Sequence, residues 1–153
     1  LMVQEGDDVK IGTPLFFDKI KPDVRWASPA SGKVSSIQFG DRRVIEKIEI
    51  KVIGSDYLDL DKKDMNEISE LKTQEVLDCI LKANLFPLIR QRPFNKVADP
   101  NDRPRDIFVS LVNSAPLSLD ISLFLQKNTN AFQAGINALS RLTSGKVYVS
   151  SKI

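Results

Sequence analysis

Lys19 is the residue whose surroundings most directly suggest chemistry. It follows Asp18 at the end of the apolar run "PLFF", and the phrase "SPASGKV" begins nearby at Ser28. A lysine held at the tip of a β-hairpin in such a setting can carry a covalently attached, swinging cofactor. The alternative is an ordinary exposed lysine in a turn, and the stiff connection "IKPD" that follows Lys19 favours this second interpretation.

Most other familiar chemistry is excluded by residue types that the chain lacks. The 153 residues contain no histidine and one cysteine. Without histidine there is no Ser-His-Asp or Cys-His catalytic unit and no His-ligated metal, and one cysteine alone cannot hold a zinc ion or an iron–sulfur cluster. The seven glycines match neither the GxGxxG nor the GxxxxGK[ST] spacing of nucleotide-binding loops.

Three other groups of residues have a possible binding role, and each also has a simpler structural interpretation. The basic residues could bind phosphate, lipid headgroups or an acidic partner, but the prolines among them favour a solvated loop. The aromatic residues could contact a quinone ring, although core packing explains them as well. The residues after a predicted strand could line a vestigial pocket, because α/β folds bind ligands there. These groups are Arg90, Arg92, Lys96, Arg103 and Arg105; Phe16, Phe17 and Trp26; and Asn113, Ser114 and Asp120.

Two weaker candidates can be set aside. Cys79 has no histidine to activate it, so nothing indicates a reactive thiol. The carboxylates Asp56, Asp59, Asp61 and Asp64 are interrupted by lysines and lack the central glycine of a calcium loop, which favours a solvated connector. We therefore predict no catalytic, cofactor-binding or metal-ligating residue in this chain.

The elements that would position these residues fall into two regions with different periodicity. Residues 1–55 combine short strand-like runs with Gly, Ser and Pro turns, which predicts a small β barrel or sandwich. Residues 56–66 are predicted to be a linker. Residues 67–153 contain a helical stripe at Val76, Leu77, Ile80 and Leu81, a strand at 106–112, a helix within 117–145 stopped by Gly145, and a final strand. A strand, a long helix and a strand favour a parallel βαβ unit.

Composition gives the broad class of protein. Apolar residues make up 42%, charged residues 27%, and the net charge is +2. Nothing here predicts binding to nucleic acid, and no apolar run approaches the ~20 residues of a membrane-spanning helix. One cysteine fits a reducing compartment. Because the chain opens inside the apolar phrase "LMVQEGDD", we expect a longer protein, with the first domain lacking its N-terminal part and the second truncated C-terminally.

Two pairs of phrases each carry a family resemblance. The pattern "VQEGDDVKIGTPL" followed by "SPASGKV" resembles the lipoyl/biotinyl-like barrel-sandwich domains. "IRQRPFNKVADP" and "AFQAGINALSRLT", in this order, resemble the A subunits of bacterial sodium-translocating NADH:quinone oxidoreductases. The resemblance implies an α+β protein with a barrel-sandwich-like piece followed by a Rossmann-like α/β domain. It also implies a complex that transfers electrons from NADH to ubiquinone and exports sodium ions.

The resemblance further implies a limited role for this chain. Related subunits of respiratory complex I and of the Rnf complex hold a flavin phosphate with a glycine-rich loop, but the equivalent stretch "FPLIRQRPFNKVADP" has no glycine. We therefore expect no cofactor here, with NADH, ubiquinone, flavins and Na⁺ handled mainly by other subunits. The expected role is structural docking or quinone access, at the cytoplasmic face of the inner membrane. Expected partners are the other subunits and quinone, not nucleic acid, and the membrane only through partner subunits. Alternatives are a lipoyl-like carrier modified at Lys19 and an Rnf-type electron-transport subunit.

Overall fold

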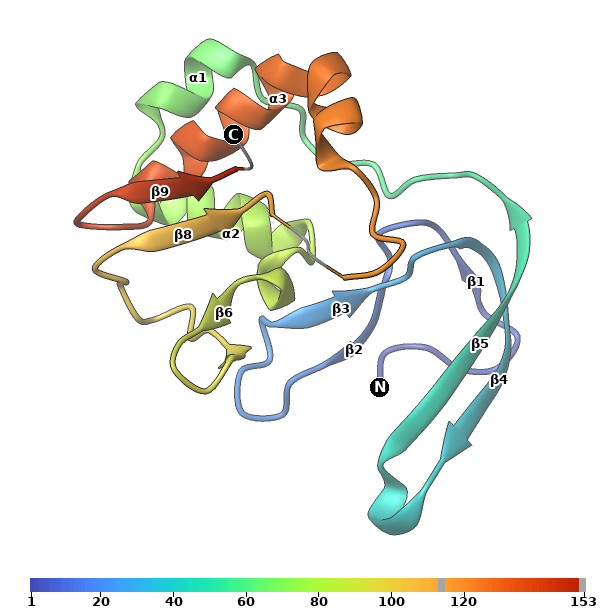
Figure 1. The fold of residues 1–153 in the computed structure, drawn as a ribbon. Helices are drawn as coiled ribbons and strands as arrows, with labels where there is room; N and C mark the ends of the chain where they lie inside the picture. The colour runs from blue at the N-terminus through green and yellow to red at the C-terminus, as the bar shows by residue number, and fades with distance from the viewer. Residues whose placement is uncertain (113–114, 152–153) are drawn as a thin grey trace. The chain divides into compact units, whose positions relative to one another are not determined.

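The computed structural model describes residues 1–112 and 115–151, and it divides them into two compact units (Figure 1). Unit 1 contains Leu1–Asp61 together with Cys79–Pro100. Unit 2 contains Lys62–Asp78 and the chain from Asn101 onward. The contacts thus group residues 79–100 with the β-rich region, whereas the sequence pattern places 67–153 in one α/β domain. The exact domain boundaries remain a prediction.

Unit 1 is built mainly from two small antiparallel sheets. A three-stranded sheet has the order β1–β4–β5, and β2 pairs with β3 in the second. The residues "KIEIKVI" lie in β5, so the alternation in this stretch correctly predicts a strand. No closed barrel forms among the described strands. The strand bounds are β1 Asp8–Val9, β2 Pro14–Phe17, β3 Arg25–Ala27, β4 Ser31–Phe39 and β5 Ile45–Gly54, with the short 3-10 helix η1 (Asp41–Arg43) between β4 and β5.

A compact apolar core holds the strands of unit 1 together. Its buried members come from the N-terminal segment, β1, β2 and β4, and partly buried residues of β2, β4 and β5 pack against them. Burying such side chains contributes about 1.5–3 kcal/mol each, which makes this core the main source of stability for the unit. The buried members are Val3, Val9, Leu15 and Val34, and the partly buried ones are Phe16, Ile37, Ile48 and Ile50.

A close backbone contact holds β4 against β5, and a separate set of hydrogen bonds holds the start of the predicted linker. A Cβ atom at Gly32 would collide with the carbonyl oxygen of Lys51 on the facing strand, so only glycine permits this close approach. Farther along, Ile11 forms a parallel bridge with Tyr57, and the Leu58 N–H donates to the Ile11 carbonyl at 2.7 Å. The start of the predicted linker is therefore hydrogen-bonded to the β-rich unit.

Residues 79–100 complete unit 1. After helix α2 (Thr73–Lys82) the chain forms the 3-10 helix η2 (Phe86–Leu88) and a hairpin of β6 (Arg90–Gln91) and β7 (Lys96–Val97). Asn84 is buried, and its side-chain amide donates to the Gly12 carbonyl at 3.0 Å. A hydrogen bond to a residue 72 positions earlier in the chain anchors this segment to the β structure.

Unit 2 contains the predicted βαβ arrangement. β8 (Ile107–Ser110) pairs in parallel with β9 (Val147–Ser150), and α3 (Ile121–Arg141) connects them. Before them lie α1 (Met65–Glu70) and α2 (Thr73–Lys82), of which the first part belongs to this unit. Val76 in the predicted stripe of α2 is buried, and the Thr73 hydroxyl donates to the Arg141 carbonyl at 2.9 Å. The parallel pairing and the α2 helix are confirmed.

Two sequence predictions about α3 are wrong in detail. The helix ends at Arg141 rather than at Gly145, because Gly145 lies in the turn before β9. A Cβ at Gly145 would collide with the Arg105 carbonyl oxygen, so this glycine permits a close approach and does not stop a helix. The helix is also broken at Asn128, where the backbone departs from helical geometry.

Within residues 1–112 and 115–151, no helix has both the length and the apolar character needed to cross a membrane.

Candidate functional site

The stretch "FPLIRQRPFNKVADP", residues 86–100, is the one that the family resemblance makes equivalent to a flavin-phosphate loop. It contains a hairpin whose two strands pair with each other. Arg90 pairs with Val97 and Gln91 with Lys96. The Ala98 N–H donates to the Ile89 carbonyl at 3.0 Å, so the backbone hydrogen bonds of the hairpin are directed inward. A phosphate cradle needs several free N–H groups converging on one point. This hairpin instead presents side chains, with Phe94 83% exposed at its tip.

Lys19 is exposed in the loop of residues 18–24 that connects β2 to β3, whereas Val24 at the end of this loop is fully buried. The Asp18 carboxylate accepts the N–H of Ile20 at 2.8 Å and of Lys21 at 3.4 Å, which makes a local turn at its start. Near its end, the Val24 N–H donates to the Lys21 carbonyl at 2.9 Å. Lys19 is therefore accessible on a hairpin connection, but the loop is several residues long and is braced from both sides.

The aromatic residues and the Ser-Pro phrase have structural roles. Phe16 stacks on Trp26 across the β2–β3 pair with ring centroids 5.0 Å apart, and Phe16 also packs against the core of unit 1. Ser28 is 2% exposed, and its hydroxyl donates to the Ala30 carbonyl at 2.7 Å to close the turn before β4. Of this group, Phe17 is partly exposed. Core packing and turn formation account for Phe16, Trp26 and Ser28, but not for Phe17.

The predicted basic cluster is divided between the two units. Arg90, Arg92 and Lys96 lie on the β6–β7 hairpin of unit 1 and are exposed. Arg103 and Arg105 belong to unit 2, where Arg103 donates to the Thr143 carbonyl at 3.4 Å. The five residues thus do not act as one loop cluster within a single unit.

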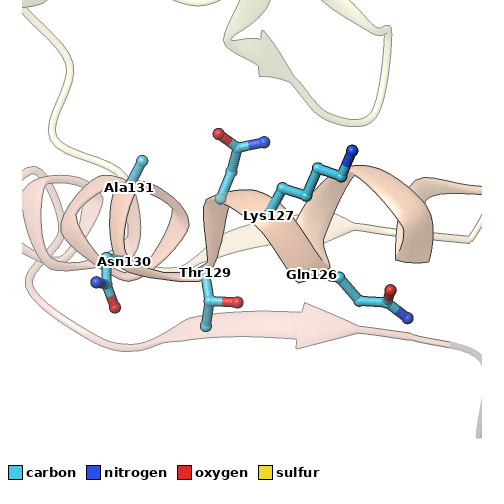
Figure 2. A pocket seen from close by; sticks show the side chains of 6 residues that line it. Gln126, Lys127, Thr129, Asn130 and Ala131 are labelled. Atoms are coloured by element: carbon cyan, nitrogen blue, oxygen red, sulfur yellow. The ribbon is translucent and has the colours of Figure 1, made fainter.

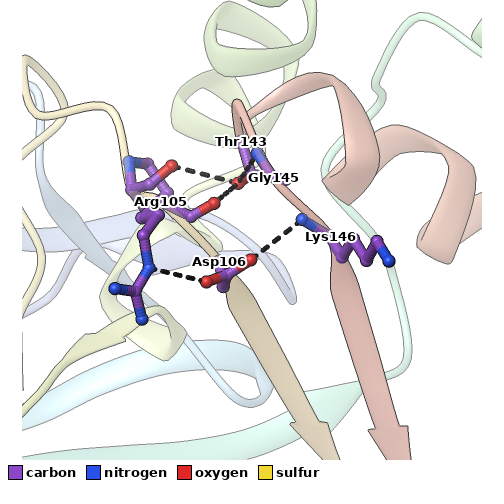
Figure 3. Close-up of polar contacts among 6 residues, drawn as sticks. Arg105, Asp106, Thr143, Gly145 and Lys146 are labelled. Atoms are coloured by element: carbon purple, nitrogen blue, oxygen red, sulfur yellow. Dashed lines mark hydrogen bonds and ion pairs between the residues drawn. The ribbon is translucent and has the colours of Figure 1, made fainter.

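In unit 2 a network of polar contacts joins the starts of the two parallel strands (Figure 3). The Thr143 hydroxyl donates to the Arg105 carbonyl at 2.6 Å and accepts the Gly145 N–H at 3.1 Å. Asp106 accepts the Lys146 N–H at 3.0 Å and forms an ion pair with the Arg105 guanidinium at 2.8 Å. These two donors, the Lys146 backbone first, hold the pKa of Asp106 below its ordinary value.

The position of this network argues for a structural role. Open α/β sheets bind ligands beyond the carboxyl ends of their strands, and the network lies at the opposite ends. At the carboxyl ends, the Leu111 N–H donates to the Ser150 carbonyl at 2.8 Å, and the Ser110 hydroxyl donates to the Val112 carbonyl at 3.2 Å.

Of the residues predicted to line a pocket at these ends, Asn113 and Ser114 lie outside the described residues. Asp120 comes directly before α3, where its carbonyl accepts the Leu123 N–H at 3.3 Å. The predicted pocket at these positions therefore stays a prediction.

A polar depression lies on α3 at the break in the helix (Figure 2). Six consecutive residues, 126–131, line it. The Asn128 side-chain amide donates to the Phe124 carbonyl and the Thr129 hydroxyl to the Leu125 carbonyl, each at 2.9 Å, so these side chains satisfy carbonyls near the break. Elsewhere, Cys79 is exposed on α2, and no group of three potential metal ligands occurs in the described part of the chain.

Two protein-family models match this chain, one after the other. Residues 1–53 match the family model described as the NqrA N-terminal barrel-sandwich hybrid domain, and residues 71–153 match the NqrA second alpha/beta domain. The second match alone covers more than half of the chain. The chain belongs to the NqrA family.

Curated relatives agree over almost the whole chain. Proteins named as the A subunit of Na(+)-translocating NADH-quinone reductase are 40% identical over 149 residues in Yersinia pseudotuberculosis and 37% identical over 142 residues in Pseudomonas aeruginosa. These matches cover 97% and 93% of this chain, and 33% and 32% of the relatives. The chain therefore spans about a third of the length of the NqrA relatives that it matches.

The NqrA matches confirm the family resemblance and the α+β fold class of a barrel-sandwich hybrid domain followed by an α/β domain. They also set aside the Rnf-type alternative. What the sequence did not reveal is the β6–β7 hairpin and its attachment to unit 1. Its two-residue strands are too short for periodicity to be visible, and the phrase "RQRPFNK" contained the only local signal, an aromatic residue among cations.

Proposed function

We propose that this chain forms a docking part of the NqrA component of a sodium-translocating NADH:quinone reductase and holds no redox group of its own. The observation that carries the proposal is that both NqrA domain matches occur in order along the chain. The reaction proposed for the whole complex is electron transfer from NADH to ubiquinone coupled to Na⁺ export. The other subunits are the proposed partners, and the cytoplasmic face of the membrane is the proposed location.

The geometry supports the absence of a flavin in this part of the protein. Backbone N–H and C=O groups of the segment "FPLIRQRPFNKVADP" form the hydrogen bonds of η2 and of the β6–β7 hairpin. Without convergent free N–H groups, a flavin phosphate would rely on the exposed side chains of three cations, which is a weaker and less specific arrangement than a cradle. We therefore propose that other subunits bind NADH and the flavins. This chain would help to shape the access of quinone to the complex without reducing the quinone itself.

Docking is tested by expressing the affinity-tagged chain together with the other subunits of such a reductase. We expect these subunits to co-purify with the tagged chain. The control is the variant Val34→Asp, which places a carboxylate in the core of unit 1 and should abolish co-purification by unfolding it. Absence of the other subunits from the unaltered chain, with its circular dichroism showing a folded protein, would refute docking.

Cofactor binding is tested on the same purified chain. Native mass spectrometry should give the unmodified mass, and titration with FMN, NADH and a soluble quinone should show no binding of FMN or NADH. Saturable quinone binding would support the access role. A retained flavin, or a lipoyl-sized mass increment that a Lys19→Arg variant removes, would replace this proposal with a flavoprotein or a carrier.

A further inference from the structure

Two loops of unit 1 are held side by side. One is the β2–β3 loop, residues 18–24, and the other is the β6–β7 hairpin (Figure 1). The Lys21 ammonium group forms an ion pair with Asp99 at 3.1 Å and donates to the Ala98 carbonyl at 3.4 Å. Because Lys21 is in the first loop and residues 98–99 directly follow β7, this contact fixes the two loops next to each other.

Each loop carries a large apolar side chain that faces solvent. Ile20 is 87% exposed in the β2–β3 loop, and Phe94 is 83% exposed at the tip of the β6–β7 hairpin. Single exposed apolar residues are common, but paired ones on adjacent projecting loops present apolar surface that a partner or a membrane can bury. Neither residue packs into the core of its unit.

The same surface carries an excess of positive charge. Residues 18–24 and 90–99 contain five lysines and arginines and three aspartates, which gives a net charge of +2. Two of the aspartates are engaged: Asp18 accepts backbone N–H groups, and Asp99 pairs with Lys21. In the described part of the chain, no ion pair involves Arg90, Arg92 or Lys96. These three cations flank Phe94 along the hairpin, and none of the described carboxylates forms an ion pair with them.

We propose that the two loops form a membrane-facing surface that binds anionic phospholipid. This surface, which we name the basic–apolar surface, consists of residues 18–23 of the β2–β3 loop and the hairpin 90–97. Aromatic and aliphatic side chains enter the headgroup region while arginine and lysine contact lipid phosphates. Apolar residues at projecting tips fit a deformable lipid surface, whereas an acidic protein partner would need a cavity shaped for each tip. The proposal differs on this point from the expectation that the membrane is reached only through partner subunits.

Vesicle sedimentation tests the electrostatic part of the proposal. The purified chain should sediment with vesicles of phosphatidylcholine mixed with phosphatidylglycerol, less so at high salt, and not with phosphatidylcholine alone. The double variant Arg92→Gln/Lys96→Gln should lower the partition coefficient by roughly 25-fold, since each surface cation contributes a factor of about five. The matched control removes two exposed cations from another hairpin of the same unit, with Arg42→Gln/Arg43→Gln, and should leave binding almost unchanged.

The apolar part is tested by fluorescence. In the Phe94→Trp variant, lipids with brominated acyl chains should quench the added indole, while Trp26, stacked on Phe16, should stay unquenched in the parent protein. All substituted side chains are exposed, so thermal unfolding should not change and any loss reports on binding. Equal binding to neutral vesicles, equal loss in the control variant, or no quenching at position 94 would overturn the proposal. So would loss of co-purifying subunits in Arg92→Gln/Lys96→Gln without any vesicle binding by the parent, because this surface would then be a protein interface.

Discussion

The hydrogen bonds of the Thr143 hydroxyl allow a quantitative prediction of how much the free energy of unfolding depends on this side chain. Thr143 is 5% exposed, and its hydroxyl contacts three backbone groups: it donates to the Arg105 carbonyl at 2.6 Å and to the Pro104 carbonyl at 3.0 Å, and it accepts the Gly145 N–H at 3.1 Å (Figure 3). The substitution Thr143→Val keeps the shape of the side chain and removes all three of these contacts. Each unsatisfied buried group costs about 1–3 kcal/mol, and some relaxation toward water is expected, so the free energy of unfolding should fall by about 2–4 kcal/mol.

Urea unfolding followed by circular dichroism measures this change, and thermal unfolding should show a midpoint lowered by roughly 5–15 °C. The matched control is Thr129→Val. Its hydroxyl also donates to a backbone carbonyl, that of Leu125, but Thr129 is exposed on α3, where water can replace the bond. We expect this control to stay within about 0.5 kcal/mol of the unaltered chain. If Thr143→Val costs no more than the control, the network is not what joins the starts of β8 and β9.

Three further predictions concern single positions. Gly32→Ala should destabilise the chain by about 2–4 kcal/mol, measured by urea unfolding, because the added Cβ meets the backbone of β5. Gly135→Ala should instead stabilise the chain by about 0.5–1 kcal/mol, since this helical glycine has open space around it. A loss of stability would show that the position has no room for a Cβ atom. The pKa of Asp106 is lowered by the Lys146 N–H and the Arg105 guanidinium, so its contribution is present above the unfolded pKa of about 4 and is lost as the pH falls through the folded value. The stability difference between the unaltered chain and Asp106→Asn should therefore shrink on acidification, and a difference that stays constant would exclude Asp106 as the source.

The parts of the fold that follow from local pattern were predictable. The stripe that includes Val76 indicated α2, the β-branched run at 106–112 indicated β8, and strand–helix–strand order indicated parallel pairing. Features that depend on contacts distant in sequence were not. Asn84 gives no sign in the sequence that its amide bonds to Gly12, and Gly145 looks like a helix stop until the Arg105 carbonyl is seen beside it.

The candidate surface shows the same division. Composition indicated basic residues between 90 and 105, but only the fold separates Arg103 and Arg105 from the others and brings Lys21 to Asp99. The exposure of Ile20 and Phe94 was equally invisible, because apolar residues in a sequence are expected to be buried. The absence of glycine from the expected phosphate loop, in contrast, could be read directly from the sequence.

The parallel pairing of β8 with β9 also has a consequence for the order of folding. The two strands can meet only after the long intervening chain, including α3, has been brought back on itself, and closing such a loop costs conformational entropy before any strand pairing repays it. The β4–β5 hairpin closes over a few residues and can form early. We therefore expect the turn that holds Thr143 and Gly145 to be among the last parts to form, so that its contacts slow unfolding far more than they speed folding.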